Sequence, residues 1–169
     1  MTSLELLGLA YECESSLGHS LDLQEMSREF LRVFIKKTSA LYGALLGYPK
    51  QGHIEIVAYK GKESFYDMVS DHLVQNLEKY EIISVKMDEL SYEILYLPLD
   101  NYMLALVYNK NTHSDMITIA NIFFSLRPKI DIGIHACLEH QRLVELNQSL
   151  LKQQHHLKTQ AERFQAILD

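Results

Sequence analysis

The sequence predicts an α+β protein, with a central antiparallel sheet of about five or six strands, helices packed on that sheet, and a long C-terminal coiled-coil helix. Three observations predict this class. Helical periodicity occupies both ends of the chain, short alternating apolar segments occupy its middle, and leucines recur every seven residues near the C-terminus. The 169 residues are enough for one domain and an extension, since single domains commonly hold roughly 100 to 200 residues.

The first forty residues predict two helices. Leu4, Leu7 and Tyr11 fall on roughly one face of a first helix, which Gly18 interrupts. Asp22, followed three positions later by Glu25, is typical of an N-cap with a capping box. The apolar residues that follow recur at helical spacing, so a second helix is expected over residues 23–34.

The middle of the chain predicts a β-hairpin, a crossing helix and further strands. Turn residues at 49–52 separate the two hairpin strands, and Gly43 and Gly47 leave room in the first strand for a helix or a ligand to approach the sheet. Ser64 is a candidate cap for a helix that carries apolar residues up to Tyr80. Strands are then expected at residues 82–87, 91–99 and 102–108.

The C-terminal part predicts one dominant helix. Pro128 removes a backbone donor and is expected to kink or restart the helix, and no proline follows it. The strongest periodicity in the chain is a seven-residue repeat formed by Leu143, Leu150, Leu157 and Phe164. A coiled-coil seam, the stripe of residues that faces the partner helix, needs a second position in each repeat. This position is filled either by Leu146, Gln153, Gln160 and Ile167, or by Asn147, Gln154, Ala161 and Leu168. Because both options are polar in the middle, the repeat predicts specific but weak helix pairing.

Composition argues against several classes of partner. The formal net charge is −6, so a broad phosphate-binding surface and a nucleic-acid partner are not expected. No stretch approaches the roughly 18 consecutive apolar residues of a membrane span, and the first residues lack the basic and apolar regions of a secretory signal. We expect a cytoplasmic chain with no membrane segment.

The sequence carries no recognisable catalytic pattern. Cys13 and Cys137 lie inside helical patterns and are expected to be buried apolar residues. His155 and His156 are adjacent, so they point to different helix faces and cannot share a metal ion. Nucleophile elbows, phosphate loops and zinc-binding helices are not found. We therefore expect no catalytic residue, metal site or cofactor, and any output enzyme would lie in a further domain.

The order of the predicted elements resembles that of GAF domains, the cytosolic sensory modules of bacterial signalling proteins. The resemblance covers roughly residues 4–146 and is carried by the helix 23–34, the strand 104–108 and the helix 130–138. It implies a GAF-like α+β fold, with a sensory domain at residues 1–140 and a signalling helix from residue 141 to residue 169. Residues 161–169 resemble the start of a PAS domain, which often follows such a helix.

The resemblance also implies a ligand pocket between the sheet and the crossing helix. The residues that it places there are Tyr59, Phe65, Met68, His72, Tyr92 and Tyr96. Aromatic and apolar walls with a few polar groups suit a small-molecule site. They suit an ordinary core equally well, so the existence and the identity of a ligand stay open.

Two functions from different classes fit these observations. The first is a regulatory sensory module that forms a homodimer through its N- and C-terminal helices and relays the signal of a small ligand. The second is a structural dimerisation module without a ligand. In both, the residues expected at the C-terminal dimer interface are Leu143, Leu146, Leu150, Leu157 and Phe164. Whether the helices pair parallel or antiparallel is not decided by the sequence.

Overall fold

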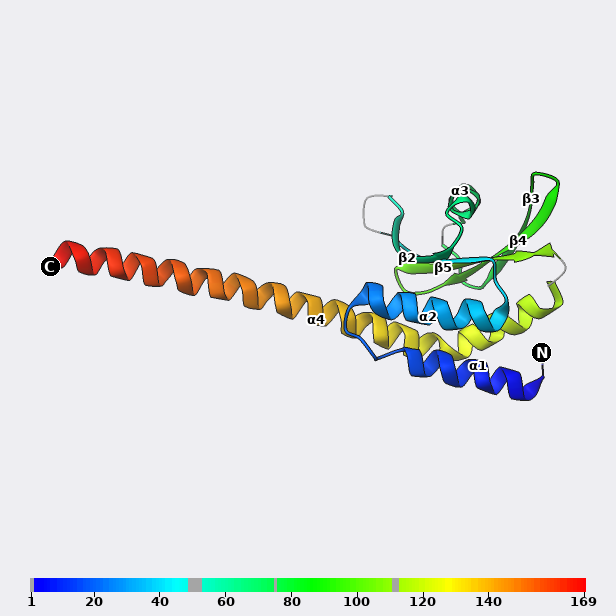
Figure 1. Cartoon of the computed structure of the whole chain (residues 1–169), viewed down its shortest axis with the longest axis horizontal. Helices are drawn as coiled ribbons and strands as arrows, with labels where there is room; N and C mark the ends of the chain where they lie inside the picture. The colour runs from blue at the N-terminus through cyan, green and yellow to red at the C-terminus, as the bar shows by residue number, and fades with distance from the viewer. Residues whose placement is uncertain (1, 49–52, 75, 111–112) are drawn as a thin grey trace.

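A computed structural model describes residues 2–48, 53–74, 76–110 and 113–169 (Figure 1). The chain alternates between helices and antiparallel strands before it ends in one long helix. The elements in chain order are α1 (Ser3–Ser16), α2 (Leu23–Thr38), β1 (Tyr42–Gly47), β2 (Glu55–Gly61), α3 (Ser64–Asp71), β3 (Glu81–Met87), β4 (Leu90–Pro98), β5 (Tyr102–Asn109) and α4 (His113–Leu168).

Within the described residues, the sheet has five strands in the order β2-β1-β5-β4-β3, and every neighbouring pair is antiparallel. This confirms the predicted α+β class and the smaller of the two expected strand numbers. One irregularity interrupts the β1–β2 pair: Leu45 lies opposite Ala58, whereas Leu46 lies opposite Ile56. The extra residue, Val57, forms a β-bulge, which shifts the register of the end of the hairpin.

Helices cover both faces of the sheet. The face covered by α2 and α4, with α1 packed outside them, is called the helical side below (Figure 1). It carries the larger core, in which Phe34, Leu104 and Phe123 are buried. The helix α3 covers the opposite face. Gly43 lets α2 approach the sheet closely, because a Cβ atom at this position would lie 2.8 Å from Cδ1 of Ile35. The predicted approach of a helix to this glycine is confirmed.

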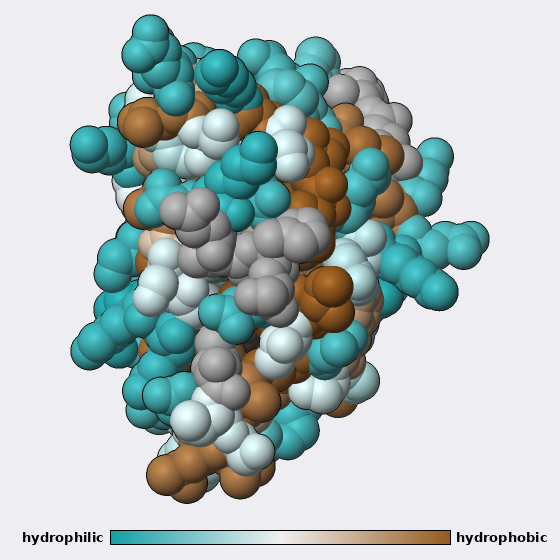
Figure 2. Space-filling model, turned by 90° about the vertical axis from the view of Figure 1, so that its right-hand side faces the viewer, coloured by the Kyte–Doolittle hydropathy of each residue, from teal (hydrophilic) through white to brown (hydrophobic). Residues whose placement is uncertain are grey.

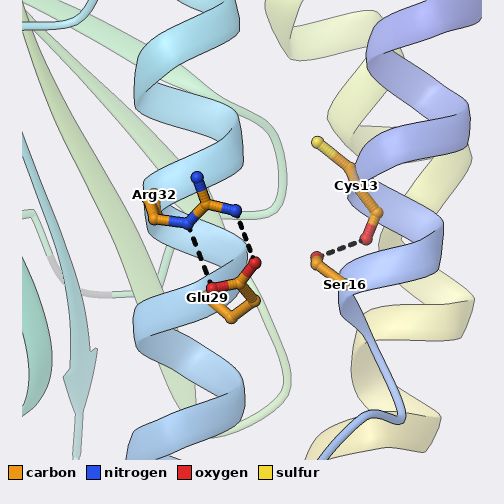
Figure 3. Close-up of polar contacts among 4 residues, drawn as sticks. All are labelled: Cys13, Ser16, Glu29 and Arg32. Atoms are coloured by element: carbon orange, nitrogen blue, oxygen red, sulfur yellow. Dashed lines mark hydrogen bonds and ion pairs between the residues drawn. The ribbon is translucent and has the colours of Figure 1, made fainter.

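Local capping fixes where the first two helices begin. Thr2 and Glu5 form a reciprocal capping box at the start of α1. At α2, the Asp22 side chain accepts a hydrogen bond of 3.0 Å from the Glu25 amide, as predicted. The Glu25 carboxylate does not complete the box, because it accepts from the Ser20 hydroxyl instead. Further along α2, Glu29 and Arg32 form a two-pronged ion pair (Figure 3).

The crossing helix α3 is shorter than the sequence predicted. It ends at Asp71 rather than continuing to Tyr80, and Ser64 is its first residue rather than its cap. Asn76 has a φ of 61°, which a right-handed helix does not allow. Leu73 and Leu77 nevertheless pack against the core on the α3 face, so tertiary contact, rather than helical hydrogen bonding, holds this segment.

Pro128 does not restart the last helix. The helix α4 runs without interruption from His113 to Leu168 and contains Pro128. The ribbon changes direction in its yellow part, the colour of residues near this proline (Figure 1). Leu126 before it and Ile130 after it are both buried in the same core, and this packing offsets the missing backbone donor. Among the described helices, none is long and apolar enough to cross a membrane.

Candidate functional site

A group of buried aromatic rings, together with one methionine, fills the space between α3 and the sheet. Tyr42 of β1, Tyr92 and Tyr96 of β4, and Phe65 and Met68 of α3 form its centre, and we call this group the aromatic face. The ring centroids of Tyr42 and Phe65 are 6.1 Å apart, and those of Phe65 and Tyr92 are 5.3 Å apart, edge to face. Such offset and edge-to-face contacts are the favoured arrangements of aromatic pairs.

The structure brings together four of the six residues that the sequence placed in a ligand pocket. Phe65, Met68, Tyr92 and Tyr96 are all buried to at least 92%, because their exposed fractions are 8% or less. Tyr59 lies at the margin of the aromatic face. Its ring stacks on Tyr42 at 6.2 Å, and its hydroxyl donates to the exposed carboxylate of Glu63.

His72 lies at the end of α3, outside the group of buried side chains. It is the C-cap of α3 and is exposed. Its Nδ1 atom lies 2.8 Å from the carbonyl oxygen of Met68, one turn earlier in the chain. The ring therefore closes the end of the helix, where carbonyl groups have no helical partner.

Tyr42 was not among the residues predicted to line the ligand pocket, although its ring lies at the centre of the aromatic face. Tyr42 is fully buried and contacts both Tyr59 and Phe65. A signal was present, because Tyr42, Ala44 and Leu46 alternate along β1 and therefore share one side of the sheet. The prediction used the glycines of this strand and not its alternation.

Burial sets the chemistry of these tyrosines. It raises the pKa of the Tyr42 hydroxyl to about 12 and also raises the pKa of Tyr96. Both hydroxyls are thus neutral at physiological pH, and that of Tyr96 donates a 2.6 Å hydrogen bond to the carbonyl oxygen of Val69. Neutral donors of this kind can orient a polar ligand or a neighbouring helix.

The two cysteines are buried, as expected from the sequence. Cys13 points from α1 into the interior next to α2 (Figure 3), and Cys137 of α4 packs on Met26 with a sulfur–sulfur distance of 3.7 Å. Burial raises the pKa of the Cys13 thiol to about 12 and also raises that of Cys137. Among the described residues, no group of three or more His, Cys, Asp or Glu side chains could hold a metal ion.

A second candidate surface runs along the outer helices. On α4, the five predicted interface residues Leu143, Leu146, Leu150, Leu157 and Phe164 are between 51% and 64% exposed. On α1, Leu4, Leu7 and Tyr11 are exposed by 68% or more. Figure 2 faces the end of the molecule that carries the N-terminus, and apolar surface gathers at its lower edge, at the level of α1.

Comparison with solved structures identifies the architecture. The GAF domain of a predicted sensor histidine kinase from Pseudomonas syringae pv. tomato superposes with a TM-score of 0.58 at 16% identity, covering 85% of this chain and 92% of its own. The nlh2 GAF domain of A. aeolicus in an inactive state gives 0.59 at 8% identity, covering 78% of this chain and 96% of its own. The chain has the GAF fold.

The same fold occurs in an enzyme. Free methionine-R-sulfoxide reductase from Neisseria meningitidis, in complex with its substrate, gives a TM-score of 0.57 at 8% identity and covers 83% of this chain and 95% of its own. Neither a family model nor a curated protein matches the sequence. At these identities the likeness is one of GAF fold, and function has to be argued from the residues of this chain.

Proposed function

We propose that this chain is a sensory regulatory module of a cytoplasmic signalling protein, in which a GAF domain passes its state to an output through paired α4 helices. The observation that carries the proposal is the length of α4 beyond the domain. Its last buried residue is Cys137, and the helix continues to Leu168. At 1.5 Å per residue, this extension is about 45 Å long.

The extension needs a partner for physical reasons. From Leu138 to Leu168 every residue is exposed apart from Thr159, which is partly exposed. Helices in proteins gain most of their stability by packing an apolar face rather than from intrinsic propensity. The apolar seam through Leu143, Leu150 and Leu157 is exposed in the described part of the chain. It is best covered by a second copy, whose seam has the same spacing.

The outer surface of α1 supports the same arrangement. α1 packs beside α4 within the domain, where Lys129 of α4 pairs with Glu14 of α1. The exposed residues Leu4, Leu7 and Tyr11 lie on the other side of α1. A homodimer that used both the N- and the C-terminal helices would cover this stripe together with the seam of α4. The domain would then end near residue 140, and the signalling helix would lead towards a PAS-like domain.

The sensory input in this proposal is a small molecule on the aromatic face, near Tyr59, Phe65, Met68, His72, Tyr92 and Tyr96. Phe65 and Met68 both belong to the eight-residue helix α3. A ligand could enter by displacing this short helix, and the movement would reach α4 through the sheet.

A structural dimerisation module without a ligand is the second candidate. One observation favours it: the rings of the aromatic face already pack on one another, with Tyr42, Phe65 and Tyr92 all 8% exposed or less. Native mass spectrometry of the purified chain separates the two functions. A retained small molecule supports the sensor, whereas a protein that stays empty against a metabolite mixture supports the structural module.

Sedimentation velocity tests the pairing. We expect the whole chain to be a dimer and a chain truncated after residue 140 to dissociate more readily. Leu150→Lys places a charge in the seam and should weaken the dimer, whereas Gln148→Lys, on the opposite face of α4, should not. A whole chain that is monomeric at every accessible concentration would rule out the relay.

A further inference from the structure

A cleft of about 670 Å³ opens where α4 leaves the domain, on the helical side of the sheet and away from the aromatic face. We call it the root cleft. Its lining includes Gly47, Glu55 and Tyr102 from the strands, Leu23 from α2, and Leu138 and Gln141 from α4. Three separate parts of the fold therefore meet around one space.

The β-bulge at Val57 decides which residue of β2 faces this cleft. With regular pairing, Ile56 would lie opposite Gly47. The bulge instead places Glu55 opposite Gly47. Because directly opposed residues share one face of a sheet, and a slip of one residue changes the face, the bulge turns Glu55 to the helical side.

Glu55, Gly47 and Tyr102 form one row across three strands. Gly47 lies opposite Glu55 on one side and opposite Tyr102 on the other. Gly47 has no side chain, and a Cβ atom there would lie 3.4 Å from the Tyr102 ring. The Tyr102 ring thus lies over Gly47, the residue that separates it from Glu55 in this row. Burial raises the pKa of Tyr102, and the nearby Glu55 carboxylate raises it further.

The charges of the lining favour a cation. Among the described lining residues, Asp22 and Glu55 are acidic and none is Lys, Arg or His. A helix N-terminus attracts anions, and that of α2 borders the cleft. However, the Asp22 carboxylate already accepts a hydrogen bond from the Glu25 amide at this end of α2. The Glu25 side chain adds a second acidic group in the first turn of the helix. The local field is therefore set by carboxylates.

We propose that the root cleft binds a small organic cation with an apolar body, such as an aliphatic amine or a guanidinium compound. The cationic group pairs with Glu55 and lies against the face of the Tyr102 ring, since aromatic faces attract cations. The apolar body contacts Leu23 and Leu138. Leu138 and Gln141 lie in the turn of α4 that follows Cys137, the last buried residue of this helix, so an occupant fixes one further turn of the helix to the domain.

This site does not rest on a ligand at the aromatic face or on the pairing of α4. Its test is a nitrogen-15 NMR titration of the whole chain with n-butylammonium chloride at constant ionic strength. Sodium butyrate, which has a similar body and the opposite charge, is the matched control. We expect saturable shifts at the amides of residues 22–24, 55–57, 101–102 and 138–141 with the amine alone.

Substitutions test whether Glu55 is the residue that binds the cationic group. Glu55→Gln should weaken amine binding about fivefold, the loss expected for one partly exposed ion pair. Glu63→Gln removes a carboxylate that lies outside the cleft and accepts a hydrogen bond from Tyr59. This control should leave the binding of the amine unchanged. Thermal unfolding of both variants checks that they are folded. Shifts that butyrate reproduces, shifts that map elsewhere, or an affinity that Glu55→Gln does not change would overturn the proposal.

Discussion

The hydroxyl of Tyr96 donates a hydrogen bond of 2.6 Å to the carbonyl oxygen of Val69 and so joins β4 to the last turn of α3. Both residues are fully buried. The carbonyl groups in the last turn of a helix have no helical partner, so this bond satisfies an acceptor that water cannot reach. It also links the aromatic face to the helix that would have to move for a ligand to enter.

Tyr96→Phe should therefore lower the free energy of unfolding by about 1–3 kcal/mol, because it leaves a buried carbonyl oxygen without its donor. The exposed bond between Tyr59 and Glu63 provides a control: Tyr59→Phe should cost less than about 0.5 kcal/mol. Urea denaturation measures both values. Equal losses in the two variants would mean that burial does not distinguish these bonds.

Gly43→Ala should destabilise the fold by about 1–3 kcal/mol, the usual cost of overpacking a core. The added Cβ atom would lie 2.8 Å from Cδ1 of Ile35 and 2.9 Å from Cδ2 of Leu106. Gly8→Ala is the matched control, because a Cβ atom there meets nothing within 4 Å and alanine is the better helix former by up to about 1 kcal/mol. Combining Gly43→Ala with Ile35→Val should restore part of the loss, as denaturation curves can show.

Cys13 should resist alkylation in the folded chain. Burial raises the pKa of its thiol to about 12 from an ordinary value of 9.0, and the thiolate is the reactive form. Mass mapping after iodoacetamide treatment at about pH 8 should find Cys13 unmodified in the native protein and modified in urea. Labelling at the same rate in both conditions would contradict the buried position of α1 against α2.

Local patterns explain why much of the fold was predictable. The N-cap at Asp22 and the strands depend on neighbours in the sequence, and both the cap and the antiparallel sheet are confirmed. The regular alternation expected within β2 is broken by the bulge at Val57. The end of α3 at Asp71 was not predictable in this way, because the following residues give up helical bonds in order to pack on the sheet. The continuity of α4 through Pro128 likewise depends on core contacts made by Leu126 and Ile130.

The candidate site was also predictable only in part. Resemblance to a family suggested Phe65, Met68, Tyr92 and Tyr96, which the fold brings together, but it did not suggest Tyr42 at their centre. The row that contains Glu55 and Tyr102 could not be read from the sequence. It depends on one bulge, and regular alternation would have placed Ile56 there instead. The seam from Leu143 to Phe164 stays a prediction until the oligomeric state is measured.

The buried tyrosines predict a loss of stability at alkaline pH. Burial raises the pKa of Tyr42 to about 12 from an ordinary 10.0, and it also raises the pKa values of Tyr96 and Tyr108. Because the folded-state pKa is the higher one, the contribution of Tyr42 is fully present below about pH 10 and is lost as the pH rises towards about 12. Each such tyrosine should lower the free energy of unfolding by about 1.4 kcal/mol per pH unit in that window.

Urea denaturation between about pH 8 and pH 11 measures this slope. Tyr42→Phe should make the slope of the free energy of unfolding against pH shallower, because one buried tyrosine no longer contributes to it. Tyr11→Phe, at a position that is 74% exposed, should leave the slope unchanged. If the wild-type slope is flat above about pH 10, the hydroxyl of Tyr42 must reach solvent or a basic partner in the folded state. The aromatic face would then be open enough to admit a ligand, which would favour the sensor over the structural module.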